Sequence, residues 1–304
     1  MTTFCEDRVA IVTGGARGIG REYALMLAAH GAKVIVNDLG GARDGTGSSS
    51  GPAGDVVDEI RAAGGEAIAN GDDVSDWNGA KRLVTQAIDT FGTLDALVSN
   101  AGILRDRMLV NMEESEWDDV IRVHLKGTFA PARHAAAYWR ERSKAGQSVS
   151  ARLINTSSSS GLYGNPGQTN YGAAKAGIAA FSIIAARELG RYGVTVNAIA
   201  PGALTRMTED LGPAEVPEEE RERRSPRWIA PLVTWLASAE SSDVSGRVFE
   251  VSGRGLSVTE GWHRGPNAEP VEDPTQIGDV VRDIVKRARK NAGMNGMDFD
   301  GGLD

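Results

Sequence analysis

The sequence has 304 residues, of which 41% are hydrophobic and 24% charged, a composition typical of a soluble globular protein with one large α/β domain or two small ones. The formal net charge is -8 and no basic stripe stands out, so nucleic acid is not expected as a partner. The single cysteine, Cys5, excludes an internal disulfide, and no apolar run reaches the roughly 18 residues of a membrane span. The N-terminal residues lead directly into a strand and do not resemble a signal peptide, so we expect a cytoplasmic protein without a membrane partner.

Short apolar runs alternate with helical patterns along the chain. Val9–Thr13 ends in glycines, as a buried parallel strand does, and residues 19–30 follow with helical spacing. Further strands are expected at 33–37, 66–70, 94–99, 152–156, 194–199 and 247–251, and helices at 55–63, 76–91, 114–142 and 169–190. This alternation predicts an α/β fold with a single Rossmann-type, doubly wound, seven-stranded parallel sheet and helices on both faces.

The C-terminal part of the chain changes character. Residues 1–262 are expected to form the dinucleotide-binding catalytic domain, and residues 263–274, with three prolines, a linker. Apolar residues then fall at the spacing of an amphipathic helix: Ile277, Val280, Val281, Ile284 and Val285. Its apolar face must pack on the same subunit or across a subunit interface. Residues 263–304 are therefore expected to be a linker, a helix and a loose tail.

The first strand ends in TGGARGIG, which has glycines at positions 14, 18 and 20. A glycine-rich turn between a strand and a helix lets the backbone approach a pyrophosphate, whose charge is favoured at the helix N-terminus. We therefore expect Gly14, Arg17, Gly18, Ile19 and Gly20 to bind a dinucleotide. A tight turn in a glycine-rich chain is the alternative.

The second strand ends at Asp38, eighteen residues after Gly20. A carboxylate there can accept hydrogen bonds from the ribose hydroxyls of the adenosine and would repel a 2′-phosphate, which favours NAD over NADP. Arg17 and Arg43 argue the other way, because either could pair with a phosphate. Asp38 could also be an ordinary loop-opening aspartate.

Two more segments follow strands at the sheet edge where ligands of open parallel sheets bind. Asp73-Val74 comes after the third strand and could hold an adenine between a side-chain acceptor and an apolar wall. The small residues of Asn100-Ala101-Gly102 come after the fourth strand and let the backbone pass close to a cofactor. Both segments are predicted to bind the dinucleotide.

Tyr171 and Lys175 are four residues apart on one helix face. A phenol with a pKa near 10 exchanges protons poorly at neutral pH, and a nearby ammonium would lower that pKa. Tyr171 would then act as a general acid or base towards an alcohol or ketone, and Lys175 could also bind the nicotinamide ribose. An incidental tyrosine and a surface lysine are the alternative for this pair taken alone.

The YGAAK segment resembles the short-chain dehydrogenase/reductase family. The resemblance also rests on TGGARGIG, Asp38, the segments at 73–74 and 100–102, and the serine run at 157–160. The resemblance implies a catalytic serine thirteen residues before the tyrosine, which is Ser158, and places Pro201-Gly202 beside the cofactor. The other three serines would supply loop polarity, with Ser160 close enough to be a spare. The family usually has an asparagine in a V-N-L context where this chain has Val123-His124-Leu125, so His124 either maintains the same water relay as a fourth catalytic residue or is a packed helix histidine.

A closer resemblance covers roughly residues 6 to 260 and rests on segments such as SNAGILRDRML, RVHLKGTF and INTSSSSGLYGNPGQTNYGAAKAG. These resemble the (3R)-hydroxyacyl-CoA dehydrogenase subgroup found in peroxisomal multifunctional enzymes of type 2. The resemblance implies oxidation of a (3R)-3-hydroxyacyl-CoA to a 3-ketoacyl-CoA with NAD, no metal, and a homotetramer. Arginines at positions 221, 223, 224 and 227 could meet CoA phosphates, although mixed charges at this spacing are more often a solvated helix.

Two other functions remain open at this point. The first keeps the fold and the chemistry but acts on a free steroid or another small secondary alcohol. The second is a regulator that binds NAD without turnover, which the intact Tyr171 and Lys175 make a remote alternative.

Overall fold

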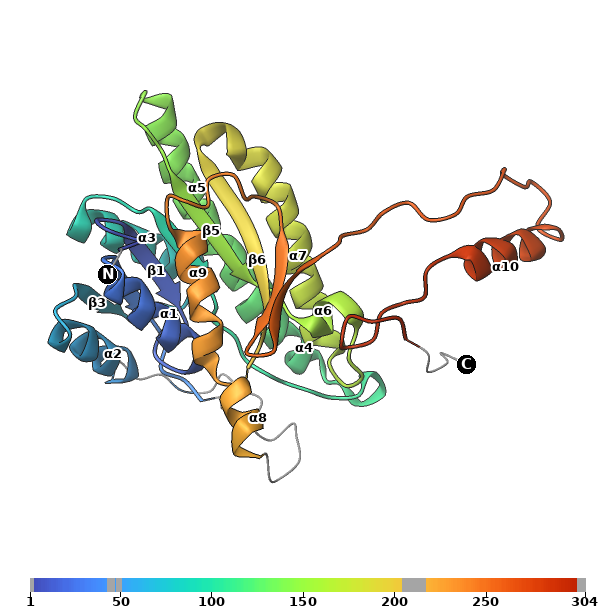
Figure 1. Ribbon diagram of the computed structural model, residues 1–304, viewed down its shortest axis with the longest axis horizontal. Helices are drawn as coiled ribbons and strands as arrows, with labels where there is room; N and C mark the ends of the chain where they lie inside the picture. The colour runs from blue at the N-terminus through green and yellow to red at the C-terminus, as the bar shows by residue number, and fades with distance from the viewer. Residues whose placement is uncertain (1–2, 43–46, 48–50, 204–216, 300–304) are drawn as a thin grey trace. The chain divides into compact units, whose positions relative to one another are not determined.

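Figure 1 shows the computed structural model of the chain, which describes residues 3–42, 47, 51–203 and 217–299. The chain divides into two compact units, Met1–Thr259 and Glu260–Asp304. The second unit contains α10 (Ile277–Arg287), at the place where the apolar spacing predicts an amphipathic helix. A functional boundary at residue 262 stays a prediction.

The first unit is built on a sheet whose strand order is β3-β2-β1-β4-β5-β6-β7-β8. The strands are β1 (Val9–Thr13), β2 (Lys33–Asn37), β3 (Ala67–Asn70), β4 (Ala96–Ser99), β5 (Ala151–Thr156), β6 (Val194–Gly202), β7 (Val248–Ser252) and β8 (Gly255–Thr259). The first seven are parallel, which confirms the predicted α/β sheet.

The eighth strand was not predicted from the sequence. It runs antiparallel to β7, with Ser252 opposite Gly255, so only Gly253 and Arg254 lie between the two strands. Leu256 and Val258 on this strand are both exposed. Because the prediction relied on buried apolar runs, a hairpin strand at the sheet edge gave it no signal.

Helices cover both faces of the sheet (Figure 1). On one face α1 (Gly18–Ala29), α2 (Gly51–Ala62) and α9 (Ala230–Ala237) share a buried cluster with the sheet, and on the other α3 (Trp77–Phe91), α5 (Gly127–Lys144) and α7 (Thr169–Leu189) do so. The alternation of β1 shows how the strand serves both layers, because Ala10 and Val12 belong to the first cluster and Val9 and Ile11 to the second.

The shorter helices lie around the carboxyl ends of the strands or in the connections between them. They are α4 (Glu114–Val120), α6 (Ser159–Tyr163) and α8 (Glu218–Arg223), and a π-helical turn at Ile121–Lys126 joins α4 to α5. The helical stretch predicted at 114–142 is thus three consecutive segments. Within the described ranges, no helix combines the length and the apolar character that a membrane crossing requires.

The strand order fixes where a ligand can bind. From β1 the chain moves to β2 and β3 on one side and then returns to β4 on the other, so the loops after β1 and β4 part from each other at the carboxyl edge. Such a switch point leaves a crevice in a parallel sheet.

Candidate active site

The glycine turn after β1 is tightly folded and has the features of a phosphate cradle. Gly14 and Gly18 have positive φ angles of 62° and 53°, and a Cβ on Gly20 would lie 2.1 Å from the Gly14 carbonyl oxygen. Arg17, the residue before α1, makes no side-chain cap to the helix, and the first turn has no acidic residue. The uncapped N–H groups and the lack of a competing carboxylate fit a bound anion.

The loop after β4 is hydrogen-bonded to this turn. The backbone nitrogens of Asn100 and Ala101 donate to Thr13 Oγ1 at 2.9 and 3.1 Å, and Asn100 Nδ2 donates to the Gly14 carbonyl oxygen at 3.2 Å. A Cβ on Gly14 would lie 2.9 Å from Ala101 Cα. The structure therefore brings together the first glycine of the turn and the Asn100–Gly102 segment, as the sequence predicts for one crevice.

Asp38 lies beside the same turn at the end of β2. Its Oδ2 accepts from the Ala16 backbone nitrogen at 3.1 Å and its Oδ1 from that of Gly40 at 2.8 Å. Two backbone donors therefore fix the carboxylate. Arg17 Nη1 donates to the neutral carbonyl oxygen of Gly41 at 3.2 Å, while Arg43 lies outside the described residues.

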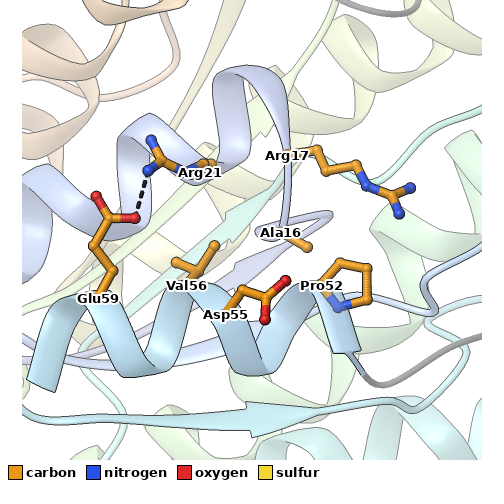
Figure 2. Close-up of a pocket in the computed structure, with 7 residues that line it drawn as sticks. All are labelled: Ala16, Arg17, Arg21, Pro52, Asp55, Val56 and Glu59. Atoms are coloured by element: carbon orange, nitrogen blue, oxygen red, sulfur yellow. Dashed lines mark hydrogen bonds and ion pairs between the residues drawn. The ribbon is translucent and has the colours of Figure 1, made fainter.

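A cavity of about 350 Å³ lies between the start of α1 and the first turns of α2. Figure 2 shows the side chains that line it. It is lined by Ala16, Arg17, Arg21, Pro52, Asp55, Val56 and Glu59. Arg21 pairs with Glu59 across the cavity and with Glu22 at 3.1 Å. The lining holds two arginines and two carboxylates, so its formal charges balance. Arg21 is already paired with carboxylates.

The remaining predicted cofactor residues lie at the same edge of the sheet. Asp73 Oδ1 accepts from the backbone and the hydroxyl of Ser75 at 2.8 and 2.7 Å, and Asp73 Oδ2 pairs with Arg122 at 3.3 Å. Val74 is buried. Pro201 and Gly202 end β6 and pair in register with Val251 and Ser252. Asp73 thus shapes its own loop, and its contact with an adenine remains a prediction.

The serine run after β5 divides into one serine at the phenol and three with other acceptors. Those three hydrogen bonds are Ser157 Oγ to the Lys175 carbonyl oxygen at 2.8 Å, Ser159 Oγ to Glu250 Oε1 at 3.1 Å, and Ser160 Oγ to Gln168 Oε1 at 2.7 Å. Ser158 forms a side-chain hydrogen bond with the Tyr171 phenol, and its Oγ accepts from the Ser160 backbone nitrogen at 3.2 Å. The geometry therefore brings Ser158 to Tyr171 and engages the expected spare, Ser160, elsewhere.

Tyr171 and Lys175 are one turn apart on α7, and the lysine Nζ lies 5.5 Å from the centroid of the phenol ring. Lys175 is buried and its Nζ donates to the Thr156 carbonyl oxygen at 2.6 Å, which fixes the amine between β5 and α7. Burial lowers the pKa of Lys175 to about 7. The amine is thus close to its titration point at neutral pH.

The phenol is shifted in the direction opposite to the one predicted from the sequence. The pKa of Tyr171 is raised to about 12, chiefly by burial, while the hydrogen bond with Ser158 lowers it and the nearby Asp106 carboxylate adds a smaller upward contribution. The prediction treated Lys175 as a full cation beside a solvated phenol. In the folded protein both groups are desolvated, and desolvation penalises the phenolate and the ammonium alike.

His124 lies in the π-helical turn and is 2% exposed. Its ring stands edge-on to the Tyr171 ring, with centroids 5.1 Å apart, and its Nε2 lies 2.7 Å from the Ile103 carbonyl oxygen. Burial and then the charge of Lys175 lower the pKa of His124 to about 3. The residue is thus a neutral imidazole in contact with Tyr171.

Three polar side chains at the site, those of Asp106, Gln168 and Glu250, were not among the residues predicted from the sequence. Gln168 Nε2 donates to Asp106 Oδ2 at 2.7 Å, which links the loop after β4 to the segment before Tyr171. Glu250 on β7 accepts from Tyr163 at 2.7 Å as well as from Ser159, and so holds α6. The position of Asp106 just after Asn100–Gly102 was an available signal, whereas nothing local in sequence marks Glu250.

A fixed glycine cradle, a half-buried tyrosine one helical turn from a buried lysine, and a serine at the phenol define the class of protein, a dehydrogenase or reductase with a dinucleotide cofactor. Residues 8–215 match the family model described as short chain dehydrogenase, and the chain belongs to the short-chain dehydrogenase/reductase family. It is therefore an oxidoreductase of a family that uses nicotinamide cofactors.

Several known proteins are similar over most of the chain. A hydroxyacyl-CoA dehydrogenase, ChsB1, from Mycobacterium tuberculosis is 46% identical over 293 residues, covering 93% of this chain and 90% of that protein. The peroxisomal multifunctional enzyme type 2 of Mus musculus is 45% identical over 259 residues, covering 85% of this chain and 33% of that protein. The crystal structure of a short chain dehydrogenase from Mycobacterium avium superposes with a TM-score of 0.87 at 54% identity, covering 95% of this chain and 98% of that one.

Proposed function

We propose that this enzyme oxidises (3R)-3-hydroxyacyl-CoA thioesters to 3-ketoacyl-CoA thioesters with NAD. The observation that carries the chemistry is the contact of Ser158 with Tyr171 above the buried amine of Lys175. The substrate class is supported by the named activity of the mycobacterial relative and by the likeness to the multifunctional enzyme.

The cofactor proposal rests on the cradle. A side chain on Gly14 or Gly20 would clash with the backbone of the Asn100–Gly102 segment or of the turn itself, so the turn keeps its tight form only with glycine at both positions. The uncapped start of α1 offers donors to a pyrophosphate. Asp38 would accept from the adenosine ribose, and its charge disfavours a 2′-phosphate. The paired state of Arg21 supports NAD further, because that arginine is already committed to carboxylates.

The residues of the cradle would hold the dinucleotide, which would supply the acceptor for the hydride that leaves the alcohol carbon. Ser158 would hold the substrate oxygen, since its hydroxyl already meets the phenol that must receive the proton. Tyr171 would take the proton as the carbonyl forms. Lys175 would donate to the nicotinamide ribose, held in place by its bond to the Thr156 carbonyl oxygen. His124 lies edge-on against the phenol ring.

The arginines of α8 and of the turn that follows it give the CoA moiety little support. Arg223 pairs with Glu219 at 2.8 Å, and Arg227 pairs with Glu222. Glu220 in turn pairs with Arg254 at 2.5 Å. These partners fit the solvated-helix interpretation, so we do not assign the CoA phosphates to these arginines.

The test is NADH formation, followed by absorbance, across a panel of (3R)-3-hydroxyacyl-CoA thioesters, their (3S) isomers and free secondary alcohols, including steroids. We expect turnover of the (3R) thioesters with NAD, and little with the other compounds. Preferred turnover of a free steroid would move the assignment to the alternative substrate class. Binding of NAD without turnover of any compound would favour the regulator.

We further propose a homotetramer located in the cytoplasm. A groove between α5 and α7 is partly lined by apolar side chains, among them Phe129, Phe181 and Tyr192, and Phe129 and Ile184 on these helices are exposed. Such a surface is suited to self-association. Size-exclusion chromatography with light scattering gives the mass directly, and a fluorescent fusion gives the location.

A further inference from the structure

His124 is the residue whose role the sequence leaves open, and it contacts two parts of the site at once. Its Nε2 lies 3.0 Å from the Ile103 backbone nitrogen and 2.7 Å from the Ile103 carbonyl oxygen. Its ring packs edge-on against Tyr171. One side chain therefore joins the backbone that continues from the Asn100–Gly102 segment to the residue that exchanges the proton.

Gly102 shows how close this junction is. A Cβ at that position would lie 2.3 Å from Cε1 of His124 and 3.0 Å from its Nδ1. The imidazole therefore occupies the volume next to the glycine, and any side chain there would displace it. The cofactor-side backbone and the histidine ring are fitted to each other.

The hydrogen-bonding pattern of the ring is consistent with a neutral imidazole. With a proton on Nε2 the ring donates to the Ile103 carbonyl oxygen, and without it Nε2 accepts from the Ile103 backbone nitrogen. Nδ1 is buried and has no hydrogen-bond partner among the described residues. A proton on both nitrogens would leave a buried cation close to the Lys175 amine, which burial and that charge both oppose.

We propose that His124 is a positioning residue, which holds the Gly102–Ile103 backbone and the Tyr171 ring in the relative placement that proton and hydride transfer require. It acts through the bond of Nε2 to Ile103 and through the edge of its ring, and it transfers no proton itself. This inference rests on the proposed function for its kinetic consequences, and on the geometry of the unliganded protein for the contacts.

Two substitutions separate the two contacts. His124→Gln keeps an amide donor and acceptor at about the reach of Nε2 and removes the ring. His124→Phe keeps the ring edge towards Tyr171 and leaves the peptide groups of Ile103 without this partner. His134→Gln is the matched control. His134 lies on α5, its ring contacts the Trp77 carbonyl oxygen at 3.2 Å, and it takes no part in the site.

We expect kcat for the hydroxyacyl thioester to fall roughly 10-fold in His124→Gln and on the order of 100-fold in His124→Phe, since small displacements of reacting groups are costly. KM for the thioester should stay near that of the unmodified protein, and His134→Gln should behave like the unmodified protein. His124→Phe leaves the buried peptide groups of Ile103 without this partner, so its Tm should fall, and kcat is therefore compared per folded molecule. The pH profile of kcat should keep its shape in both variants. The profile should keep its shape because both substitutions leave in place the titratable groups that face His124. These are Lys175 and Tyr171, with Asp106 beside the phenol.

Three results would overturn the proposal. The first is unchanged kcat in both variants. The second is loss of one limb of the pH profile, which would make His124 a proton carrier. The third is a lowered Tm with unchanged kcat per folded molecule, which would leave it a packing residue. If His124→Phe does not fold, His124→Gln alone decides among these outcomes.

A binding measurement keeps this test separate from the substrate assignment. NADH fluorescence titration requires no turnover, and the loosened Gly102–Ile103 backbone should weaken NADH binding by about 10-fold in His124→Phe, while His134→Gln binds normally. An unmodified protein that binds NADH but turns over no thioester would refute the proposed function and leave the binding test in force. Equal NADH affinity in His124→Phe would overturn the positioning role.

Discussion

At the scale of single residues, the Tyr171 hydroxyl is the group whose removal isolates the chemistry from the packing. Tyr171→Phe keeps the ring that packs against His124 and removes only the oxygen that meets Ser158. We expect kcat to fall at least about 100-fold, the range for loss of a general acid or base, with little change in NADH affinity. Tyr138→Phe on α5 is the matched control and should retain full activity. Full activity of Tyr171→Phe would refute the proton-transfer role.

Asp38 is the residue on which cofactor choice depends. Asp38→Ala removes the carboxylate that two backbone nitrogens fix beside the cradle, so its repulsion of a 2′-phosphate disappears. The ratio of kcat/KM for NAD to that for NADP should fall by about 10-fold or more, the scale of one charged contact. Asp58→Ala on the exposed side of α2 makes the same change in net charge and should leave the ratio unchanged. A preference for NADP in the unmodified protein would contradict the assignment.

At the scale of elements, the turn that leads into α1 can be tested by adding one methyl group. Gly20→Ala places a Cβ 2.1 Å from the Gly14 carbonyl oxygen, so the turn must open and the anion cradle is lost. Gly54→Ala is the control, because a Cβ there meets nothing within 4 Å and alanine is the better helix former inside α2. NADH titration should show binding abolished in the first variant and retained in the second. Retained binding in Gly20→Ala would exclude this turn as the phosphate site.

Most elements of the sheet could be predicted because buried parallel strands are continuous apolar runs, as Val9–Thr13 is. The exposed hairpin strand β8 lacks that signal. The π-helical turn that carries His124 is also invisible locally, since one extra residue per turn leaves no mark in an apolar pattern. Ser158 could be singled out only through the family resemblance, which implies a serine thirteen residues before the tyrosine. Burial is a property of the whole fold, which is why the direction of the phenol's pKa shift could not be read from the Tyr171–Lys175 spacing.

At the scale of the whole molecule, a buried arginine joins the two halves of the first unit. Arg152 on β5 is 1% exposed and donates to the Ser238 and Ala239 carbonyl oxygens at 2.8 and 3.1 Å, beyond the end of α9. Arg152→Met leaves these carbonyls buried without that donor, which should cost about 3 kcal/mol in the free energy of unfolding. Chemical denaturation measures the loss. The kcat of the folded fraction should be unchanged, because Arg152 lies at the opposite end of β5 from Ser158.

An exposed arginine supplies the comparison for this stability measurement. Among the described residues, Arg140 forms an ion pair with its neighbour Glu141 alone, at 2.9 Å on the surface of α5. Arg140→Met should therefore change the free energy of unfolding by less than about 0.5 kcal/mol. Equal losses in the two variants would show that the charge of Arg152, rather than its buried bonds, is what the fold depends on.

The pH dependence of the free energy of unfolding should also include a contribution from Lys175. Its pKa in the folded protein is about 7, below the ordinary 10.5 of an unfolded lysine. Between these values the unfolded chain binds more protons at this residue than the folded one, so the contribution of Lys175 makes stability rise with pH across that window. Urea denaturation at pH 7 and pH 9.5 should therefore show a larger gain for the unmodified protein than for Lys175→Met. The exposed Lys144→Met should match the unmodified protein, and a gain that is the same in all three proteins would mean that Lys175 remains an ammonium when buried.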